Sequence, residues 1–155
     1  MTRQSAPRRD EPSPRPPALF VYGTLLFPEV VRALIGREPD RTAGTVAGWR
    51  AAALPGRPYP GLVPAAGATA GGQLLTGLTH VEWRIIEAFE NGGYELTELT
   101  LTDGRHGWAY AYAESLSPLP EDWSAAEFGA HRLADFVAHC TAWRRHHEAA
   151  GRPDG

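Results

Sequence analysis

The spacing of apolar and polar residues changes several times along the chain, and the first clear pattern predicts a strand followed by a helix. Residues 19–22 are four apolar residues of strand-forming types that stop at Gly23, which predicts a short strand and a sharp turn. Pro28 can open a short helix, because apolar residues then recur on one side as far as Ile35. Gly36 can end that helix.

Longer extended segments follow in the middle of the chain. Residues 42–54 contain large apolar residues separated by glycines, which predicts either a strand pair or one long bent strand. Residues 55–64 contain too many prolines for regular structure, so we expect an ordered loop or a linker, whose apolar residues suit one wall of a pocket. Residues 65–72 are small and predict nothing definite, and residues 73–78 predict a strand.

A second helix is predicted from a capping signal. Thr79 and Glu82 have the spacing of a capping box, in which each side chain bonds to the backbone N–H of the other residue. The residues predicted to form its buried face, at helical spacing, are Val81, Ile85, Ala88 and Phe89. The sequence Asn91-Gly92-Gly93 can end the helix, which places Glu90 at its C-terminal end.

The last third of the chain predicts a hairpin and a long helix. Residues 94–102 and 107–113 read as two strands joined by a turn at Asp103-Gly104. A second capping box spans residues 124–127, and apolar residues at helical spacing continue to about Ala149. We therefore expect one long final helix packed on the sheet.

Length and composition favour one folded domain with a flexible leader. The 155 residues suit a single domain, which we place at residues 18–150. Residues 1–17 hold four arginines and five prolines without an apolar pattern, which predicts a disordered tail. A solvated leader is the favoured reading of these arginines, and an adaptor segment for an acidic partner is the alternative.

Charge and cysteine content narrow the classes of partner. The net charge is −3, from 15 basic and 18 acidic residues, so we expect no nucleic acid and no anionic membrane as a partner, but a small molecule. No apolar run approaches the roughly 20 residues of a membrane helix. The single Cys140 cannot form an internal disulfide and the N-terminus lacks a signal-peptide core, which predicts a cytoplasmic protein.

Glu90 is the candidate for chemistry. A solvated glutamate has a pKa of about 4.3 and is a weak base near neutrality, whereas effective catalytic bases lie nearer 7. The negative end of the helix dipole, the like charge of Glu87 and the aromatic neighbours Phe89 and Tyr94 should all raise the Glu90 pKa. The alternative is an ordinary solvated glutamate at a helix end. The turn at Gly23 adds backbone N–H groups that can bind a carboxylate or a polarised carbonyl.

Four short motifs in this order resemble a known family. They are Tyr22–Leu25, Tyr59–Pro64, residues 86–91 followed by Tyr94, and Ala109–Tyr112. Together they resemble the γ-glutamylcyclotransferase-like family, which includes the plant AIG2-like proteins. The resemblance spans residues 18–113, while the C-terminal helix is less diagnostic.

This resemblance implies an α+β fold, a small mixed β-barrel with flanking helices and a pocket at one end of the barrel. Members of the family release 5-oxoproline from γ-glutamyl amides without a metal or an organic cofactor. The resemblance implies that Glu90 is the catalytic acid and base. The residues that match the substrate-binding positions are Tyr22, Gly23, Thr24, Leu25, Tyr94 and Tyr112. The implied partner is therefore a small γ-glutamyl substrate.

The sequence departs from the family pattern at three positions, and it also allows another interpretation of the function. Thr24 replaces a commoner serine, Asn91 replaces a glycine, and Leu96 stands where an arginine is frequent; these changes concern the substrate more than the reaction. A non-catalytic binding module with the same fold is the alternative function. His139 and Cys140 do not have zinc-site spacing with the other histidines, so we expect solvent-facing histidines and a buried cysteine. The amine that leaves and the oligomeric state are left open.

Overall fold

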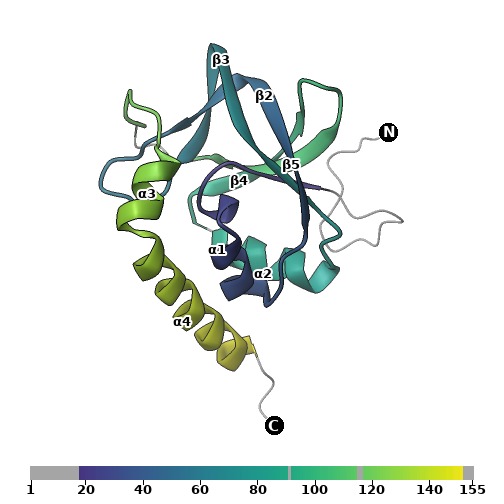
Figure 1. The fold of residues 1–155 in the computed structure, drawn as a ribbon, viewed down its shortest axis with the longest axis vertical. Coiled ribbons are helices and arrows are strands. Elements are labelled where there is room, and N and C mark those ends of the chain that lie inside the picture. Colours follow the sequence, from purple (N-terminus) through teal and green to yellow (C-terminus); the bar gives the residue numbers. More distant parts are fainter. Residues whose placement is uncertain (1–17, 91, 115–116, 152–155) are drawn as a thin grey trace.

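The computed structural model describes residues 18–90, 92–114 and 117–151. The tail predicted at residues 1–17 and the predicted cap residue Asn91 lie outside the described residues. The strands are β1 (Leu19–Val21), β2 (Asp40–Ala52), β3 (Gly61–Thr76), β4 (Tyr94–Thr100) and β5 (His106–Tyr112). The helices are the 3₁₀ helix η1 (Thr24–Leu26), α1 (Pro28–Ile35), α2 (His80–Glu90), α3 (Ala125–His131) and α4 (Leu133–Gly151). The described chain is therefore α+β, as predicted (Figure 1).

The short strand β1 lies in the middle of a five-stranded mixed sheet with the order β2-β3-β1-β5-β4. It pairs antiparallel with β3 and parallel with β5. Its side chains alternate between two hydrophobic clusters: Leu19 and Val21 belong to one, and Phe20 belongs to the other together with Tyr22, which follows the strand. A strand that is buried on both faces should be apolar throughout, which explains the unbroken apolar run in the sequence.

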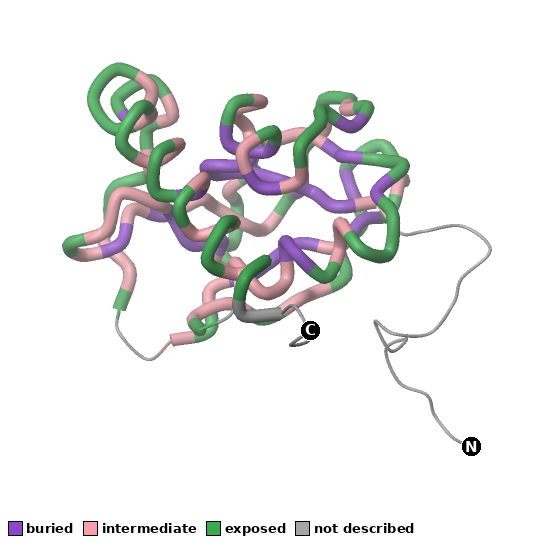
Figure 2. Tube along the Cα trace, turned by 90° about the horizontal axis from the view of Figure 1, so that it is seen from below, coloured by how far each residue is buried: buried purple, intermediate pink, exposed green. Residues whose placement is uncertain are grey.

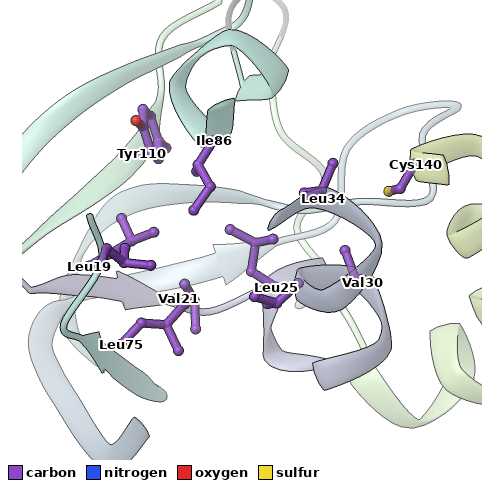
Figure 3. Packing of buried hydrophobic residues seen from close by; sticks show 11 residues of the cluster. Leu19, Val21, Leu25, Val30, Leu34, Leu75, Ile86, Tyr110 and Cys140 are labelled. Atoms are coloured by element: carbon purple, nitrogen blue, oxygen red, sulfur yellow. The ribbon is translucent and has the colours of Figure 1, made fainter. Parts of the chain in front are cut away.

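The first cluster fills the space between the sheet and the helices. In Figure 3, side chains from β1, β3, α1 and α2 point toward one another, and Cys140 reaches the same cluster from α4. Cys140 is fully buried, as predicted. Figure 2 shows that the buried residues follow the central strands, whereas the outer turns of the helices are exposed. No helix in the described part of the chain combines the length and the apolar character that a membrane crossing requires.

The β2–β3 pair is longer than predicted. Residues 40–52 form one long bent strand, which was one of the two predicted alternatives, with a register shift between Ala47 and Trp49. The prediction of a loop as far as residue 64 is wrong from Gly61 onward, and residues 65–72 are also part of β3. Pairing with β2 supplies the backbone hydrogen bonds that this proline- and glycine-rich segment needs. Pro64 is accommodated because its partner Trp49 adjoins the register shift.

The sheet curls but does not close into the predicted barrel. Leu62 of β3 also pairs with Ala111 of β5, which bends the sheet around its inner cluster. The edge strands β2 and β4 share no ladder among the described residues. They are joined instead beyond the end of β4, where Thr102 N–H donates to Thr45 O at 2.9 Å. Arg105 adds a hydrogen bond of 2.7 Å to the carbonyl of Ala43.

Helix α2 begins at the predicted capping box. Glu82 N–H donates to Thr79 Oγ1 at 3.1 Å, and Thr79 N–H donates to Glu82 Oε1 at 2.9 Å. Val81, however, is 65% exposed, so its predicted place on the buried face is wrong. Ile85 is buried as predicted, and the fully buried Ile86, which was not predicted, meets the core beside it.

The predicted final helix is interrupted. Ser124 Oγ accepts a hydrogen bond from Glu127 N–H at 3.1 Å, which confirms that a helix is capped there. Arg132 then leaves the helical conformation, with φ −126° and ψ −15°, and divides the segment into α3 and α4. Figure 1 shows α3 and α4 following one another along one side of the molecule. The apolar spacing continues across this break, so the pattern alone did not reveal it.

Candidate active site

The site is built around the turn that follows β1. A side chain at Gly23 would place its Cβ 2.8 Å from Pro60 Cγ, so the turn needs glycine for space and not for an unusual φ. The chain then enters η1, in which Leu26 N–H donates to Gly23 O at 2.9 Å and Phe27 N–H donates to Thr24 O at 3.1 Å. The N–H groups of Thr24 and Leu25 precede these bonds, as the first N–H groups of a helix do. They are available to a ligand that carries negative charge.

A cavity of about 210 Å³ opens beside this turn. The predicted residues that line it are Tyr22, Gly23, Thr24, Leu25, Glu90 and Tyr94. The cavity is smaller than the roughly 300–1,000 Å³ of sites for drug-sized ligands, so it suits a compact ligand. Tertiary structure thus brings the end of α2 and the start of β4 to the turn after β1.

Glu90 lies in this cavity with a raised pKa. The residue is half-buried, and the burial of its carboxyl group raises the Glu90 pKa from 4.5 to about 7. Burial is the cause, so neither Glu87 nor the helix end is needed to explain the shift. In the described ranges, no arginine forms an ion pair with Glu90 that would lower its pKa again. At neutral pH this carboxyl group can therefore both accept and release a proton.

The charge of Glu90 contributes to the raised pKa values of neighbouring residues. The pKa values of the Tyr22 and Tyr94 hydroxyls are raised, chiefly by burial and further by Glu90. The pKa of the Cys140 thiol is raised to about 12 by burial, again with a contribution from Glu90. Both tyrosines are consequently neutral at any pH at which Glu90 changes its protonation.

Tyr22 fastens three strands together. Its hydroxyl donates to Tyr110 O at 2.6 Å and accepts from Leu62 N–H at 3.2 Å. The hydroxyl is thus bound to the backbone of β5 and β3, although the sequence suggested a donor for the ligand. Tyr22 therefore fixes the end of β1 beside the cavity, and its ring forms part of the cavity surface.

Tyr94 and Tyr112 also support the backbone. Tyr94 Oη donates to Pro60 O at 2.6 Å, which holds the loop before β3 against the cavity. Tyr112 is not among the residues that line the cavity. Its ring packs edge-on against Tyr94, with centroids 6.4 Å apart, and lies directly over Gly61. The structure therefore places Tyr112 behind Tyr94.

Several cavity residues were not identified as site residues from the sequence. Arg57, Tyr59 and Pro60 line the cavity from the loop before β3, which was expected to form one wall. Arg57 Nη2 is bound to Glu114 Oε1 at 2.8 Å. A second group of residues, from α4, comprises Phe136, His139 and Trp143. The two aromatic residues of this group have ordinary core spacing, and His139 was expected to face solvent only, so no sequence signal marked them.

No metal site accompanies the cavity. Across residues 18–90, 92–114 and 117–151, no three side chains of histidine, cysteine, aspartate or glutamate lie close enough together to hold an ion. The side chains that line the cavity include the Glu90 carboxyl group, the Arg57 guanidinium, the His139 imidazole and several aromatic rings.

The Glu90 pKa predicts that stability depends on pH. The folded pKa lies above the unfolded one, so this group favours the folded state fully below pH 4.5, and that contribution is lost as the pH rises through 7. Because the cavity admits solvent, we expect the loss to be about 1–2 kcal/mol. Between pH 4.5 and 8, urea unfolding should show the wild type losing that much free energy of unfolding relative to Glu90→Gln. An equal difference at both pH values would show that Glu90 is not desolvated.

Comparisons with known proteins identify a family and several relatives of this chain. Residues 19–125 match the family described as gamma-glutamyl cyclotransferase, AIG2-like. AIG2-like protein C of Arabidopsis thaliana is 34% identical over 125 residues, covering 77% of this chain and 73% of the relative.

Solved structures support the fold. A solution structure from Arabidopsis thaliana has a TM-score of 0.62 and 24% identity, covering 88% of this chain and 94% of that chain. A gamma-glutamyl cyclotransferase structure has a TM-score of 0.50 and 15% identity, covering 81% and 86% of the two chains. At these identities the structures bear on the fold alone, whereas the family match covers more than half of the sequence. The chain therefore belongs to the gamma-glutamyl cyclotransferase, AIG2-like family.

Proposed function

We propose that this protein is an enzyme that releases 5-oxoproline from a small γ-glutamyl amide, with Glu90 as general acid and base. The observation that carries the proposal is the Glu90 carboxyl group, with a pKa of about 7, in the same cavity as the turn at residues 23–25. A pKa near neutrality lets one group take a proton in one step and return it in the next. The family match supports the same activity.

The turn would hold the acidic parts of the substrate. The N–H groups of Thr24 and Leu25 suit either the substrate carboxylate or the oxyanion that forms on the γ-carbonyl. The rings of Tyr22 and Tyr94 would confine the glutamyl chain, because their hydroxyls are already bound to backbone carbonyls. Such confinement favours ring closure, since the attacking nitrogen and the γ-carbon belong to one molecule.

The proposed reaction balances without a further reactant. The Glu90 carboxylate takes a proton from the substrate α-ammonium, and the freed amine attacks the γ-carbonyl carbon to form the five-membered ring. Glu90 returns that proton to the amide nitrogen as the bond from the γ-carbon to that nitrogen breaks. The second proton lost by the attacking nitrogen leaves with the released amine, which departs as an ammonium ion. The other product is neutral at its ring nitrogen.

A substrate panel tests the proposal. Purified protein is incubated with γ-glutamyl amino acids, γ-glutamyl amines and glutathione, and 5-oxoproline is measured by mass spectrometry. We expect release from at least one class of γ-glutamyl compound, and none from the matching α-glutamyl compounds, whose γ-carbon is a free carboxylate and carries no amide to break. Binding of γ-glutamyl compounds without release would instead assign the protein as a non-catalytic binding module.

The rate should follow the ionisation of Glu90. The carboxylate form is the one that accepts a proton, so kcat/KM should rise with pH and level off above a midpoint of about 7. Rates measured from pH 5 to 8.5 with a cleaved substrate check this. A midpoint near 4.5, the value of a solvated carboxyl group, would contradict the role proposed for Glu90.

A further inference from the structure

The wall that α4 contributes to the cavity is aromatic and lies beyond the family match. That match ends at residue 125, and α4 begins at Leu133. Phe136, His139 and Trp143 nevertheless line the same cavity as Glu90. They are spaced by three and four residues, which puts them on one face of the helix. This wall is therefore a feature of the chain that the family match does not cover.

The aromatic wall consists of these three residues of α4 together with Phe89 of α2, and its rings are in contact with one another. Phe89, the residue before Glu90, packs edge-on against Trp143 with centroids 5.1 Å apart and against Phe136 at 6.2 Å. His139 lies 6.3 Å from Phe89 and 5.9 Å from Phe136. Trp143 is stacked on His147 at 4.7 Å, which fixes its ring from the outer side. Ring separations of this size are typical of favourable aromatic contacts, and the rings meet edge-to-face or tilted, so the wall offers a continuous aromatic surface next to the carboxyl group.

The charged groups of the substrate, its α-carboxylate and α-ammonium, are not expected to bind at this wall. Of the described residues that line the cavity, Arg57 and Glu90 are the basic and acidic side chains besides His139, and Arg57 is already bound to Glu114. The carboxylate and ammonium of a γ-glutamyl group need polar partners, whereas the rings of Phe89, Phe136 and Trp143 are mainly apolar and His139 is the one imidazole in the wall. Those groups belong at the turn of residues 23–25, so the wall faces the other end of the substrate.

The other end is the amine that leaves. His139 is exposed although it lines the cavity, which places the wall at the opening, where a leaving group can extend toward solvent. Phe89, Phe136 and Trp143 are only partly buried and so have surface left to cover. Covering such surface favours an apolar group and does not compensate a second charge.

We propose that the aromatic wall of Phe89, Phe136, His139 and Trp143 selects γ-glutamyl amides whose leaving amine carries an uncharged aromatic group. The inference rests on the proposed function, because it assigns the leaving-group side of the same site. An amino acid as leaving group would bring a carboxylate against this wall and is disfavoured.

Two substrates that differ only in a phenyl ring test the inference. They are the γ-glutamyl amides of 2-phenylethylamine and of ethylamine. We expect kcat/KM to be about tenfold or more higher for the phenylethyl amide, the range in which apolar pockets discriminate. A ratio near one or below, with 5-oxoproline released from both, overturns the inference and leaves the proposed function standing.

Variants of Trp143 locate the preference. Trp143→Leu keeps an apolar side chain in the core contact but removes the ring, and Trp143→Ala removes both. Either folded variant should reduce the ratio between the two substrates toward one. His146→Ala is the matched control, because His146 is exposed on the same helix and does not line the cavity, and it should keep the wild-type ratio. Circular dichroism establishes that each variant is folded, and an unchanged ratio in Trp143→Leu overturns the inference.

A binding measurement separates the inference from the proposed function. If neither amide is cleaved, the substrate panel decides about the proposed function, and calorimetry with the same two amides decides about the wall. Tighter binding of the phenylethyl amide, lost in Trp143→Leu, supports an aromatic subsite. Equal binding of the two amides overturns it.

Discussion

Replacing Glu90 by glutamine should reduce 5-oxoproline release by about 10²–10⁴-fold, the usual contribution of a general acid and base. Glutamine has nearly the same shape but cannot take the proton of the α-ammonium. The loss should fall mainly on kcat, because substrate contacts with the turn at residues 23–25 are retained. The measurement is steady-state release of 5-oxoproline from the best substrate of the panel.

Glu87→Gln is the matched control for this loss. Glu87 lies one turn earlier on α2 and does not line the cavity, so the same substitution there should leave the rate within about twofold. Glu90→Gln should unfold at the same temperature as the wild type or a higher one, since it removes a desolvated carboxyl group. A folded Glu90→Gln variant with normal activity would contradict the proposed mechanism.

Gly72→Ala should be the most destabilising of the small substitutions, costing about 3 kcal/mol or more of the free energy of unfolding. A Cβ at this position would fall on the backbone oxygen of Val21 and lie 2.8 Å from Phe20 Cζ. A backbone atom of a paired strand cannot move aside as a flexible side chain can. The end of β1, which leads into the turn at Gly23, would shift, so activity should fall as well. Urea unfolding and the 5-oxoproline assay measure the two effects.

Gly71→Ala separates this clash from the general cost of removing a glycine. The neighbouring Gly71 has the opposite orientation in β3, and a Cβ there meets no atom within 4 Å. We expect Gly71→Ala to change stability by less than about 1 kcal/mol. Equal losses for the two variants would show that β1 and β3 are not packed as closely as described.

The comparison of Gly71 and Gly72 shows what sequence patterns cannot predict. Residues 65–72 carry no apolar pattern and gave no prediction, yet they are the middle of the longest strand. Gly72 stands there because Phe20 and the backbone of Val21 come close, as Leu101 does to Gly44 in β2, whereas Gly67 has a positive φ of 83°. A residue chosen to leave room for a distant segment contributes no pattern of its own.

The sequence predicted most of the residues that line the cavity, but it did not predict what several of their side chains are bound to. Six of the seven predicted site residues line one cavity, and the short motifs in the sequence are enough to single them out. The sequence could not show that the Tyr22 and Tyr94 hydroxyls are bound to backbone carbonyls, or that Tyr112 lies behind Tyr94. It left open whether Trp143 belongs to the core or to a pocket wall, and only the structure places it in the cavity lining.

The sequence by itself determined what depends on near neighbours: the strand that stops at Gly23, the capping boxes before α2 and α3, the hairpin of β4 and β5, and the motifs of the family. These signals act over a few residues, through backbone hydrogen bonds and side chains one turn apart. Only the tertiary structure decided that β3 starts at Gly61, that the sheet stays open, and that α4 walls the cavity. It also decided that Glu90 is desolvated, because burial depends on segments far away in the chain, which no local pattern records.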